Sequence, residues 1–328
     1  MKELSLKNIS KKIALINKYL KYMRFHDTNK YKPILSAFPS RIYIENTNYC
    51  NANCIMCPRD KMTRKPGFMS FGLYHKLIKE IAKHKHEVER LHLHNFGEPL
   101  LDNQLPDKIK LAKSHGITHT YIVTNGSLLT STMSKRIIKS GLDEIKISFY
   151  GIDAPSYNST MKNLNFNDTL KNIKEFISVR KKMRADKPML IFQFIPQLAK
   201  KATANKFRAL FSRHIDKKIG DRLNFYWLHN FGGGKTYNRF YHGITSICSF
   251  PWNTFVVLYT GDVTTCCLDY DGKQIMGNVR ENSIKSVWNG KKLVNARNDF
   301  NNLRIEKYPC CSKCENTHAR INNSLYIS

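Results

Sequence analysis

The sequence predicts an α/β protein in which parallel strands are joined by helices. Short apolar segments of strand length alternate six times with helix-length segments between about residue 40 and residue 228. Polar and cysteine-containing motifs follow the strand segments, as expected where the carboxyl ends of parallel strands meet at one edge of a sheet. A length of 328 residues is enough to bury a full-sized core and is long for one domain.

The elements follow one another in a regular order. Strands are expected at residues 42–45, 89–95, 118–123, 144–149, 190–196 and 223–228. Helices are expected between them at residues 70–84, 107–115, 131–140, 167–182 and 202–214, with Ser70 as the cap of the first. Right-handed crossovers connect such strands. Three glycines at 232–234 then predict a flexible joint to a second region. A phosphate loop would need a different glycine pattern before its Lys-Ser/Thr pair.

Three cysteines follow the first predicted strand. Cys50, Cys54 and Cys57 are spaced C-x3-C-x2-C. Three thiolates on one short loop can hold three irons of a cubic iron–sulfur cluster and leave the fourth iron without a protein ligand. A cluster needs such an open iron if it is to bind and reduce a small molecule. The triplet therefore predicts a catalytic [4Fe-4S] cluster.

Structural zinc and disulfide bonds are the alternatives for these cysteines. Zinc sites normally use four protein ligands arranged in C-x2-C pairs, and an x3 gap fits that pattern poorly. Disulfides need an oxidising compartment, whereas the sequence starts MKELSLKNIS without an apolar signal segment. We therefore expect a cytoplasmic protein whose cysteines bind metal.

The triplet resembles the signature of the radical S-adenosylmethionine (radical SAM) superfamily. Phe96-Gly97-Glu98-Pro99 resembles the Gly-Gly-Glu-Pro segment that holds the methionine amino group of SAM in that family, with Phe96 in place of the first glycine. Met56 stands where the family often has an aromatic residue, and it still offers adenine an apolar contact. The SAM-binding residues that we expect are Met56, Gly97, Glu98, Pro99, Thr124, Asn125 and Ser148.

The resemblance also implies the domain organisation. We expect a partial (β/α)6 barrel of the radical SAM type at residues 39–230, preceded by a basic region at residues 1–38. Residues 231–328 would form a small α+β domain. Six strand–helix units suit this partial barrel better than a closed eight-fold barrel.

Six further cysteines lie in the C-terminal third of the chain: Cys248, Cys266, Cys267, Cys310, Cys311 and Cys314. Their spacing resembles the SPASM/twitch extension of radical SAM enzymes, in its shorter twitch form with one auxiliary [4Fe-4S] cluster. The resemblance assigns the ligands to Cys248, Cys266, Cys311 and Cys314. Four thiolates close the coordination shell, so this cluster would pass electrons. Structural zinc is the alternative, and the choice within each adjacent pair stays open.

The resemblance implies a radical reaction on a substrate carbon. A 5′-deoxyadenosyl radical formed from SAM takes a hydrogen atom, and the auxiliary cluster offers a place for a second electron. We expect oxidation of an alcohol on a small polar substrate of the sugar, cyclitol or nucleotide-sugar type, with Asp269 as a possible base. A flavodoxin- or ferredoxin-type protein would supply the reducing electron.

Other outcomes stay open. A hydrogen atom returned from the thiol of Cys267 or Cys310 would give an epimerase. A peptide substrate would make the protein a maturase of ribosomally made peptides, although residues 1–41 are too short for a separate peptide-binding domain. An iron–sulfur electron-transfer protein is the non-enzyme alternative, and it leaves the segment Gly97-Glu98-Pro99 unexplained.

The formal net charge of +29 is unusual. No recognition helix, zinc-finger spacing or aromatic RNA-binding signature accompanies it, so we expect no nucleic-acid partner. Residues 4–24 predict a basic amphipathic helix, with a narrow apolar seam at Leu6, Ile9, Ile13, Ile16, Leu20 and Met23. We expect this helix to pack on its own domain, with weak contact to an anionic membrane surface as the alternative.

Overall fold

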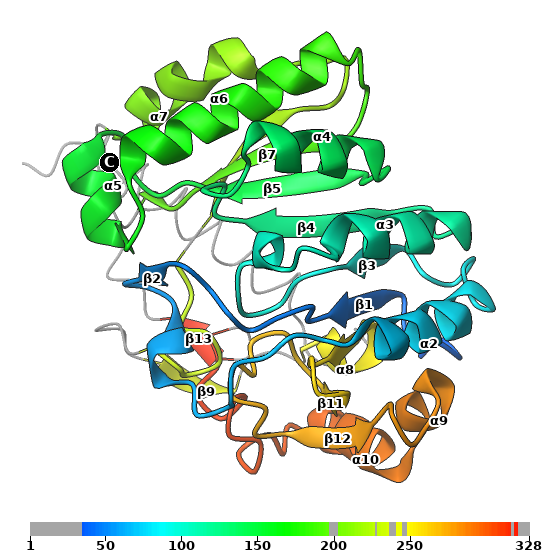
Figure 1. The fold of residues 1–328 in the computed structure, drawn as a ribbon. Coiled ribbons are helices and arrows are strands. Elements are labelled where there is room, and N and C mark those ends of the chain that lie inside the picture. Colours follow the sequence, from blue (N-terminus) through cyan, green and yellow to red (C-terminus); the bar gives the residue numbers. More distant parts are fainter. Residues whose placement is uncertain are drawn as a thin grey trace, which may run out of the picture.

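One sheet of nine strands runs through the molecule. The structure is a computed structural model that describes residues 35–196, 203–226, 228–235, 241–244, 248–315 and 318–320. The order of its strands is β12-β11-β10-β1-β3-β4-β5-β7-β8, which Figure 1 shows from the helical side. The expected helix at residues 4–24 lies outside the described residues.

The six predicted strands are all present, and every neighbouring pair among them is parallel. They are β1 (Arg41–Ile44), β3 (Arg90–His92), β4 (Thr120–Thr124), β5 (Glu144–Ser148), β7 (Met189–Phe194) and β8 (Arg222–Phe225). Because the strands lie in chain order, each crossover connects neighbours. The predicted partial six-fold α/β barrel is therefore confirmed.

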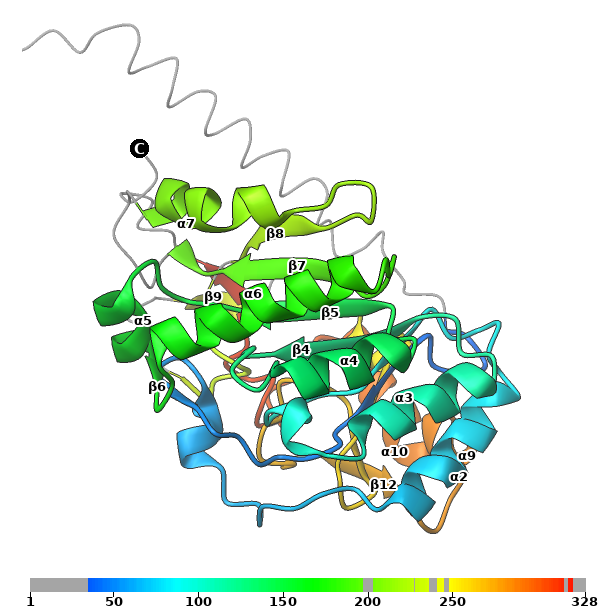
Figure 2. The ribbon, with the colours of Figure 1, turned by 45° about the horizontal axis from the view of Figure 1, so that its top comes forward.

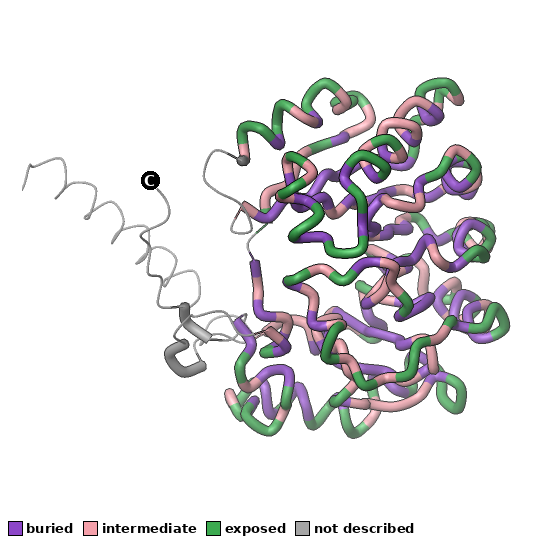
Figure 3. Tube along the Cα trace, turned by 60° about the vertical axis from the view of Figure 1, so that its left-hand side comes forward, coloured by how far each residue is buried: buried purple, intermediate pink, exposed green. Residues whose placement is uncertain are grey.

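The five predicted helices are also present, and they cover the outer face of these strands (Figure 2). They are α2 (Phe71–Ala82), α3 (Leu105–Ser114), α4 (Ser131–Lys139), α6 (Phe166–Lys182) and α7 (Thr203–Phe211). The hydroxyl of Ser70 accepts a hydrogen bond from the amide of Leu73, which confirms the predicted cap. Figure 3 shows the result as buried strands beneath partly exposed helices.

A short helix was not expected. Helix α5 (Ala154–Thr160) begins at Asp153, whose carboxylate accepts a hydrogen bond from the amide of Ser156 in a capping box. It leads into β6 (Met161–Lys162), which pairs with β2 (Asn53–Cys54) inside the cysteine loop. The helix has only seven residues, too few for a periodic apolar pattern to stand out.

The C-terminal region extends the same sheet. Strand β10 (Thr254–Val257) lies parallel to β1, and β11 (Asp262–Thr264) and β12 (Ile275–Asn278) follow as an antiparallel hairpin. Three helices accompany these strands: α8 (Phe250–Asn253), α9 (Ile284–Trp288) and α10 (Lys291–Asn301). The expected α+β region thus continues the barrel sheet beyond β1 (Figure 1); the boundary at residue 231 stays a prediction. Strands β9 (Tyr241–Ile244) and β13 (His318–Arg320) form a separate pair.

Two further properties bear on the setting of the protein. Among the described residues, no helix is both long enough and apolar enough to cross a membrane. The main core lies between the sheet and the helices, where Ile42, Ile44, Ile145 and Ile147 have no exposed surface. These apolar side chains alternate along β1 and β5 with side chains that point to the opposite, inner face of the sheet.

Candidate active site

The first cysteine set forms a half-buried loop directly after β1. Cys50, Cys54 and Cys57 are all free thiols. The pairing of β2 with β6 holds the middle of the loop, and the amide of Cys57 donates to the carbonyl of Cys54 at 3.0 Å. The sulfur of Met161 lies 3.5 Å from the Cys54 thiol. The chain therefore brings all three predicted ligands together on one short, anchored loop.

Burial controls the protonation of these thiols. It raises the pKa of Cys50 to about 11 and also raises the pKa values of Cys54 and Cys57. Thiolates at this position therefore need a cationic partner at neutral pH, and bound iron supplies one. The donor set of three free thiols on one loop fits a cluster that keeps one iron open.

Gly97 lies tightly against residues 47–49, which connect β1 to this loop. Its φ is +123°, and an added Cβ would lie 2.4 Å from the carbonyl oxygen of Thr47. The amide of Glu98 donates to the carbonyl of Tyr49 at 2.7 Å. Only glycine fits such a conformation and such a close approach. The Gly97-Glu98-Pro99 segment is therefore held beside Cys50, as its predicted role in binding SAM requires.

The carboxylate of Glu98 is committed to the protein itself. It accepts hydrogen bonds from the Thr124 hydroxyl at 2.6 Å, from the Asn125 amide at 2.8 Å and from the Leu100 amide at 3.1 Å. Burial raises the pKa of Glu98 to about 7. Its side chain therefore joins the segment that follows β3 to the end of β4, and its role toward SAM stays a prediction.

A second set of contacts joins the cysteine loop to β4. The side chain of Asn125 donates to Asn51 at 2.9 Å, and Asn51 donates to the Ser127 hydroxyl at 2.8 Å. The structure thus brings Thr124 and Asn125 to the predicted site. Ser148 lies farther along the strand ends, where its hydroxyl accepts a hydrogen bond from Tyr150.

The remaining two SAM-binding predictions are also placed. Met56 is buried within the cysteine loop. Pro99 begins a short 3-10 helix, Pro99–Leu101, at the end of the glutamate segment. Their roles toward SAM stay predictions.

Phe96 stands in place of the first glycine of the Gly-Gly-Glu-Pro motif, and its side chain packs against other aromatic rings. Its ring is buried, 6.0 Å from the ring of Tyr270 and 6.3 Å from that of Phe231. Both partners belong to the C-terminal part of the chain. The departure from the family pattern therefore creates an aromatic contact between the barrel and the second cysteine region.

The second cysteine set surrounds one small cavity. Its lining consists of Cys248, Phe250, Pro251, Thr265, Cys266, Phe300, Cys310, Cys311 and Cys314. All four predicted ligands are in this lining, and none forms a disulfide. Within the described residues, no three His, Cys, Asp or Glu side chains converge as they would around a single metal ion. Several thiols around one cavity fit an iron–sulfur cluster.

The adjacent cysteine pairs differ from each other. Cys310 shares the cavity with Cys311, and their sulfurs are 3.9 Å apart. Cys267, in contrast, is not among the residues that line the cavity. Its thiol lies close to the thiol of Cys266 and to the hydroxyl of Tyr43 on β1. Cys310 is therefore one of the cavity thiols, whereas Cys267 lies outside the lining but next to the thiol of Cys266.

Asp269 lies in the turn after these cysteines. Its carboxylate accepts hydrogen bonds from the amides of Lys273 at 3.0 Å and Gln274 at 2.9 Å. Burial raises its pKa above the usual range. These bonds are typical of an aspartate that holds a turn, so its predicted role as a base rests on the sequence alone.

Several contacts between the two cysteine regions were not expected. Asp271 accepts hydrogen bonds from the amide and the hydroxyl of Thr63, and Lys235 forms an ion pair with Asp60 at 2.8 Å. These partners are roughly two hundred residues apart and carry no local sequence signal. They hold the loop after Cys57 against the C-terminal region.

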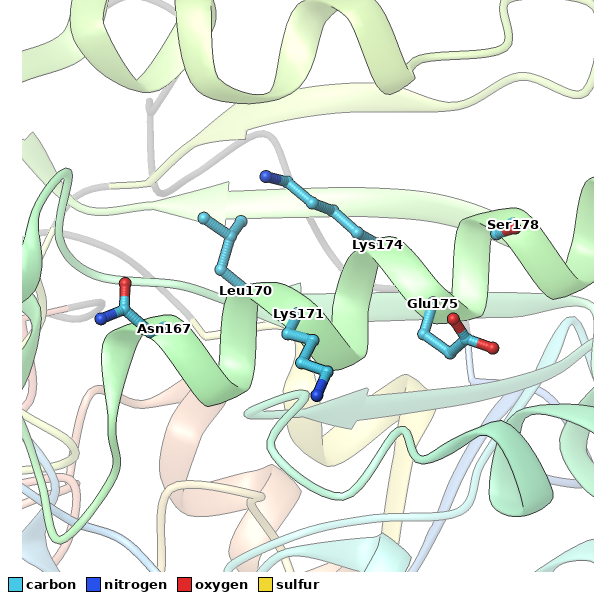
Figure 4. A pocket seen from close by; sticks show the side chains of 6 residues that line it. All are labelled: Asn167, Leu170, Lys171, Lys174, Glu175 and Ser178. Carbon is cyan, nitrogen blue, oxygen red and sulfur yellow. The ribbon is translucent and has the colours of Figure 1, made fainter.

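A shallow surface depression lies elsewhere, on the outer face of α6 (Figure 4). It is lined by Asn167, Leu170, Lys171, Lys174, Glu175 and Ser178. All six come from one helix and none is a predicted site residue. This depression is separate from both cysteine sets.

Comparison with known proteins agrees with this geometry. Residues 44–187 match the Radical SAM superfamily, and residues 248–315 match SPASM, an iron–sulfur cluster-binding domain. The chain is 23% identical over 279 residues to the S-adenosyl-L-methionine-dependent 2-deoxy-scyllo-inosamine dehydrogenase of Niallia circulans, across 84% of this chain and 93% of that protein.

A second relative aligns over a shorter stretch. The chain is 26% identical over 149 residues to the tungsten-containing aldehyde ferredoxin oxidoreductase cofactor-modifying protein of Pyrococcus furiosus. That match covers 45% of this chain and 41% of the relative, so less than half of the relative is represented.

Solved structures share the fold. BtrN in complex with AdoMet and 2-DOIA is 20% identical, with a TM-score of 0.59 over 86% of this chain and 94% of that one. Streptococcus suis SuiB bound to precursor peptide SuiA is 14% identical, with a TM-score of 0.63 over 90% and 73% of the two chains.

Proposed function

The chain combines a radical SAM domain, which uses an iron–sulfur cluster and SAM, with a C-terminal SPASM domain that carries an auxiliary iron–sulfur cluster. From this premise we propose that it oxidises an alcohol on a small polar substrate to a carbonyl. With both clusters and SAM bound, SAM would supply an acceptor for the substrate hydrogen atom, a base would take a proton, and the auxiliary site held by the second cysteine set would take the remaining electron.

The observation that carries this proposal is the position of the second cysteine set. Its thiols surround one cavity, and the turn beyond Cys266 is tied directly to the loop beyond Cys57. An electron acceptor in that cavity would lie next to the inner face of the barrel. An oxidation needs such an acceptor, whereas a redox-neutral rearrangement does not.

Each group of predicted site residues would have its own role. Cys50, Cys54 and Cys57 would hold the first cluster, with the backbone around Gly97 and the side chain of Met56 placing SAM against it. Glu98 keeps this arrangement together through Thr124 and Asn125. Cys248, Cys266, Cys311 and Cys314 would hold the auxiliary cluster, and Cys310 lies close enough to the same cavity to replace one of them.

The substrate class is inferred from two sources. The relative from Niallia circulans is named for an aminocyclitol, 2-deoxy-scyllo-inosamine, and it aligns over most of both chains. The inner face of the barrel also carries polar side chains, among them Gln193, Tyr150 and Ser148 in one hydrogen-bonded series. A hydroxylated ring of the cyclitol or sugar type suits such a surface. A flavodoxin- or ferredoxin-type protein is the proposed reductant.

Substrate-dependent cleavage of SAM tests the proposal. The reconstituted protein is incubated anaerobically with SAM, dithionite and hydroxylated ring compounds, including 2-deoxy-scyllo-inosamine. At least one compound is expected to raise the release of 5′-deoxyadenosine and to be converted to a ketone in equal amount. The Cys311→Ser and Cys248→Ser variants are expected to lose ketone formation. Ketone formation that survives in both variants would remove the auxiliary site from the reaction.

Epimerisation is the second candidate, and one observation favours it. Cys267 lies outside the lining of the auxiliary cavity and beside Tyr43, whose ring faces the inside of the barrel. A thiol in that place could return a hydrogen atom to a substrate radical. The product would then have the oxidation level of the substrate.

A further inference from the structure

We propose that Lys146 binds an anionic group, a phosphate or a carboxylate, on a hydroxylated substrate inside the barrel. This inference rests on the proposed function only for the presence of a substrate inside the barrel. The substrate would carry a negative charge, and Lys146 would bind it.

The position of Lys146 on β5 directs it into the barrel. Its neighbours Ile145 and Ile147 are fully buried on the helical side of the sheet, so Lys146 lies on the inner face. Its amino group lies 5.6 Å from the ring centre of Tyr121 and 4.8 Å from that of Tyr226. These rings form part of the wall around the amino group.

The amino group has no anionic partner. Within the described residues it makes no hydrogen bond and no ion pair, and its contacts are the faces of the two tyrosine rings. Burial lowers its pKa to about 8. A half-buried cation without a counterion is unfavourable for folding, and ionisable groups in this situation concentrate at functional sites.

The surrounding charges favour an anion. Arg90 and Arg222 add positive charge near Lys146, and Glu144 is the carboxylate that acts on it. That carboxylate is already shared, at 3.2 Å from Arg90 and 3.2 Å from His119. Lys146, Arg90 and Arg222 therefore place three positive charges around a single carboxylate, that of Glu144. That carboxylate is already paired with Arg90.

Unpaired polar atoms next to Lys146 indicate the rest of the ligand. Both ring nitrogens of His92, the Nδ1 of His94 and the Oε1 of Gln193 are buried and have no hydrogen-bond partner in the part of the chain that the structure describes. Burial lowers the pKa of His94 to about 3, so its ring stays neutral. Neutral imidazoles and an amide oxygen offer acceptors and donors to hydroxyl groups. The set suits a hydroxylated molecule rather than an inorganic ion alone.

Part of the inner face keeps some solvent exposure, although His92, Tyr121 and Gln193 on that face are buried. Lys146, Ser148, Tyr43 and His94 are all half-buried, whereas the alternate positions on the same strands are fully buried. Ser148 lies two residues beyond Lys146 toward the strand end where the first cysteine loop is located. A substrate held by Lys146 would therefore extend toward that loop.

Anion binding by the reconstituted protein tests the inference without turnover. Thermal unfolding is followed at constant ionic strength in chloride, inorganic phosphate or acetate. We expect at least one of the two anions to raise Tm, by about 2 °C at a ten-fold excess over its Kd and then in proportion to the logarithm of its concentration. The anion that acts identifies the group as phosphate or carboxylate.

Variants locate the effect. Lys146→Gln is expected to lose this anion-dependent rise in Tm, and Lys146→Arg, which keeps the charge, is expected to retain it. Lys171→Gln is the matched control, because Lys171 is exposed on α6, and it should behave as the unchanged protein. An equal rise in Lys146→Gln, no rise in the unchanged protein, or loss of the rise in Lys146→Arg and Lys171→Gln alike would overturn the inference.

The two proposals can fail separately. Anion binding is an equilibrium measurement, so its absence leaves alcohol oxidation untouched. Conversely, a protein that binds phosphate through Lys146 and forms no ketone would contradict the proposed function alone.

Discussion

The guanidinium of Arg64 meets the buried carboxylate of Glu45 through two hydrogen bonds of 2.8 Å each. The same carboxylate accepts a hydrogen bond from the backbone amide of Tyr259. The Nε of Arg64 donates a hydrogen bond to the backbone carbonyl of Tyr270. Glu45 directly follows β1, and both tyrosines belong to the C-terminal region. This pair therefore holds the two cysteine sets in one arrangement.

Removal of this pair is expected to weaken the whole protein. Arg64→Met leaves the carboxylate of Glu45 buried without its charged partner, which should lower the free energy of unfolding by about 3 kcal/mol or more. Lys110→Met is the control, because the Asp107–Lys110 pair is more than half exposed and should contribute less than about 1 kcal/mol. Denaturant unfolding measures both. An equal loss of unfolding free energy in the two variants would show that the buried Arg64–Glu45 pair stabilises the protein no more than an exposed ion pair does.

Gly97 provides a prediction about backbone conformation. Gly97→Ala places a methyl group against the backbone of residues 47–49 at a positive φ. We expect a loss of stability of more than about 2 kcal/mol together with weaker SAM binding. Gly72→Ala in α2 meets no atom within 4 Å and should stabilise the protein by about 0.5–1 kcal/mol. Equilibrium unfolding and SAM titration measure these effects. An unchanged unfolding free energy and SAM affinity in Gly97→Ala would contradict the close approach of Gly97 to the backbone of residues 47–49.

The first cluster is expected to need all three of its cysteines. No other cysteine lies on that loop, so Cys54→Ala cannot be compensated locally. The reconstituted variant should release no 5′-deoxyadenosine from SAM. A Cys50/Cys54/Cys57 triple alanine variant should keep roughly half of the iron, since each cubane holds about four irons. Zinc in place of iron in the triple variant would make the second site structural.

Lys146 should make stability depend on pH in a defined direction. Its pKa is about 8 in the folded protein and 10.5 in the ordinary case. Below pH 8 the folded protein bears the unfavourable buried cation, so Lys146→Met should be more stable than the unchanged protein by roughly 1–3 kcal/mol. Between pH 8 and 10.5 the folded form releases the proton first, and the difference should shrink. Denaturant unfolding at several pH values measures this; a constant difference would contradict the burial of a charged amine.

Much of the barrel could be predicted from local pattern. Alternating residues such as Ile42, Tyr43 and Ile44 mark a strand with one apolar face, and Ser70 marks the start of the following helix. The cysteine triplet and Gly97-Glu98-Pro99 could be found because their chemistry depends on residue type and short spacing. The cavity that gathers Cys248, Cys266, Cys311 and Cys314 also agrees with the predicted set.

The remainder depends on contacts between distant parts of the chain. The pairing of β10 with β1 joins residues about two hundred positions apart, and nothing local in Thr254–Val257 indicates its partner. Arg64 and Glu45 read as ordinary charged residues until the fold buries them together. Lys146 likewise reads as a solvent-facing strand residue, because an alternating pattern cannot tell the inside of a barrel from bulk water.

The proposed alcohol oxidation is tested most directly by a reaction in deuterated water. A hydroxylated compound that stimulates 5′-deoxyadenosine release is incubated with the reconstituted protein, and the product is analysed by mass spectrometry and NMR. We predict one ketone per 5′-deoxyadenosine, with the substrate hydrogen recovered in 5′-deoxyadenosine and no carbon-bound solvent deuterium from the transfer step. A product of unchanged oxidation level that carries one deuterium at the reacting carbon, and that is lost in Cys267→Ala or Cys310→Ala, would contradict the account and identify an epimerase.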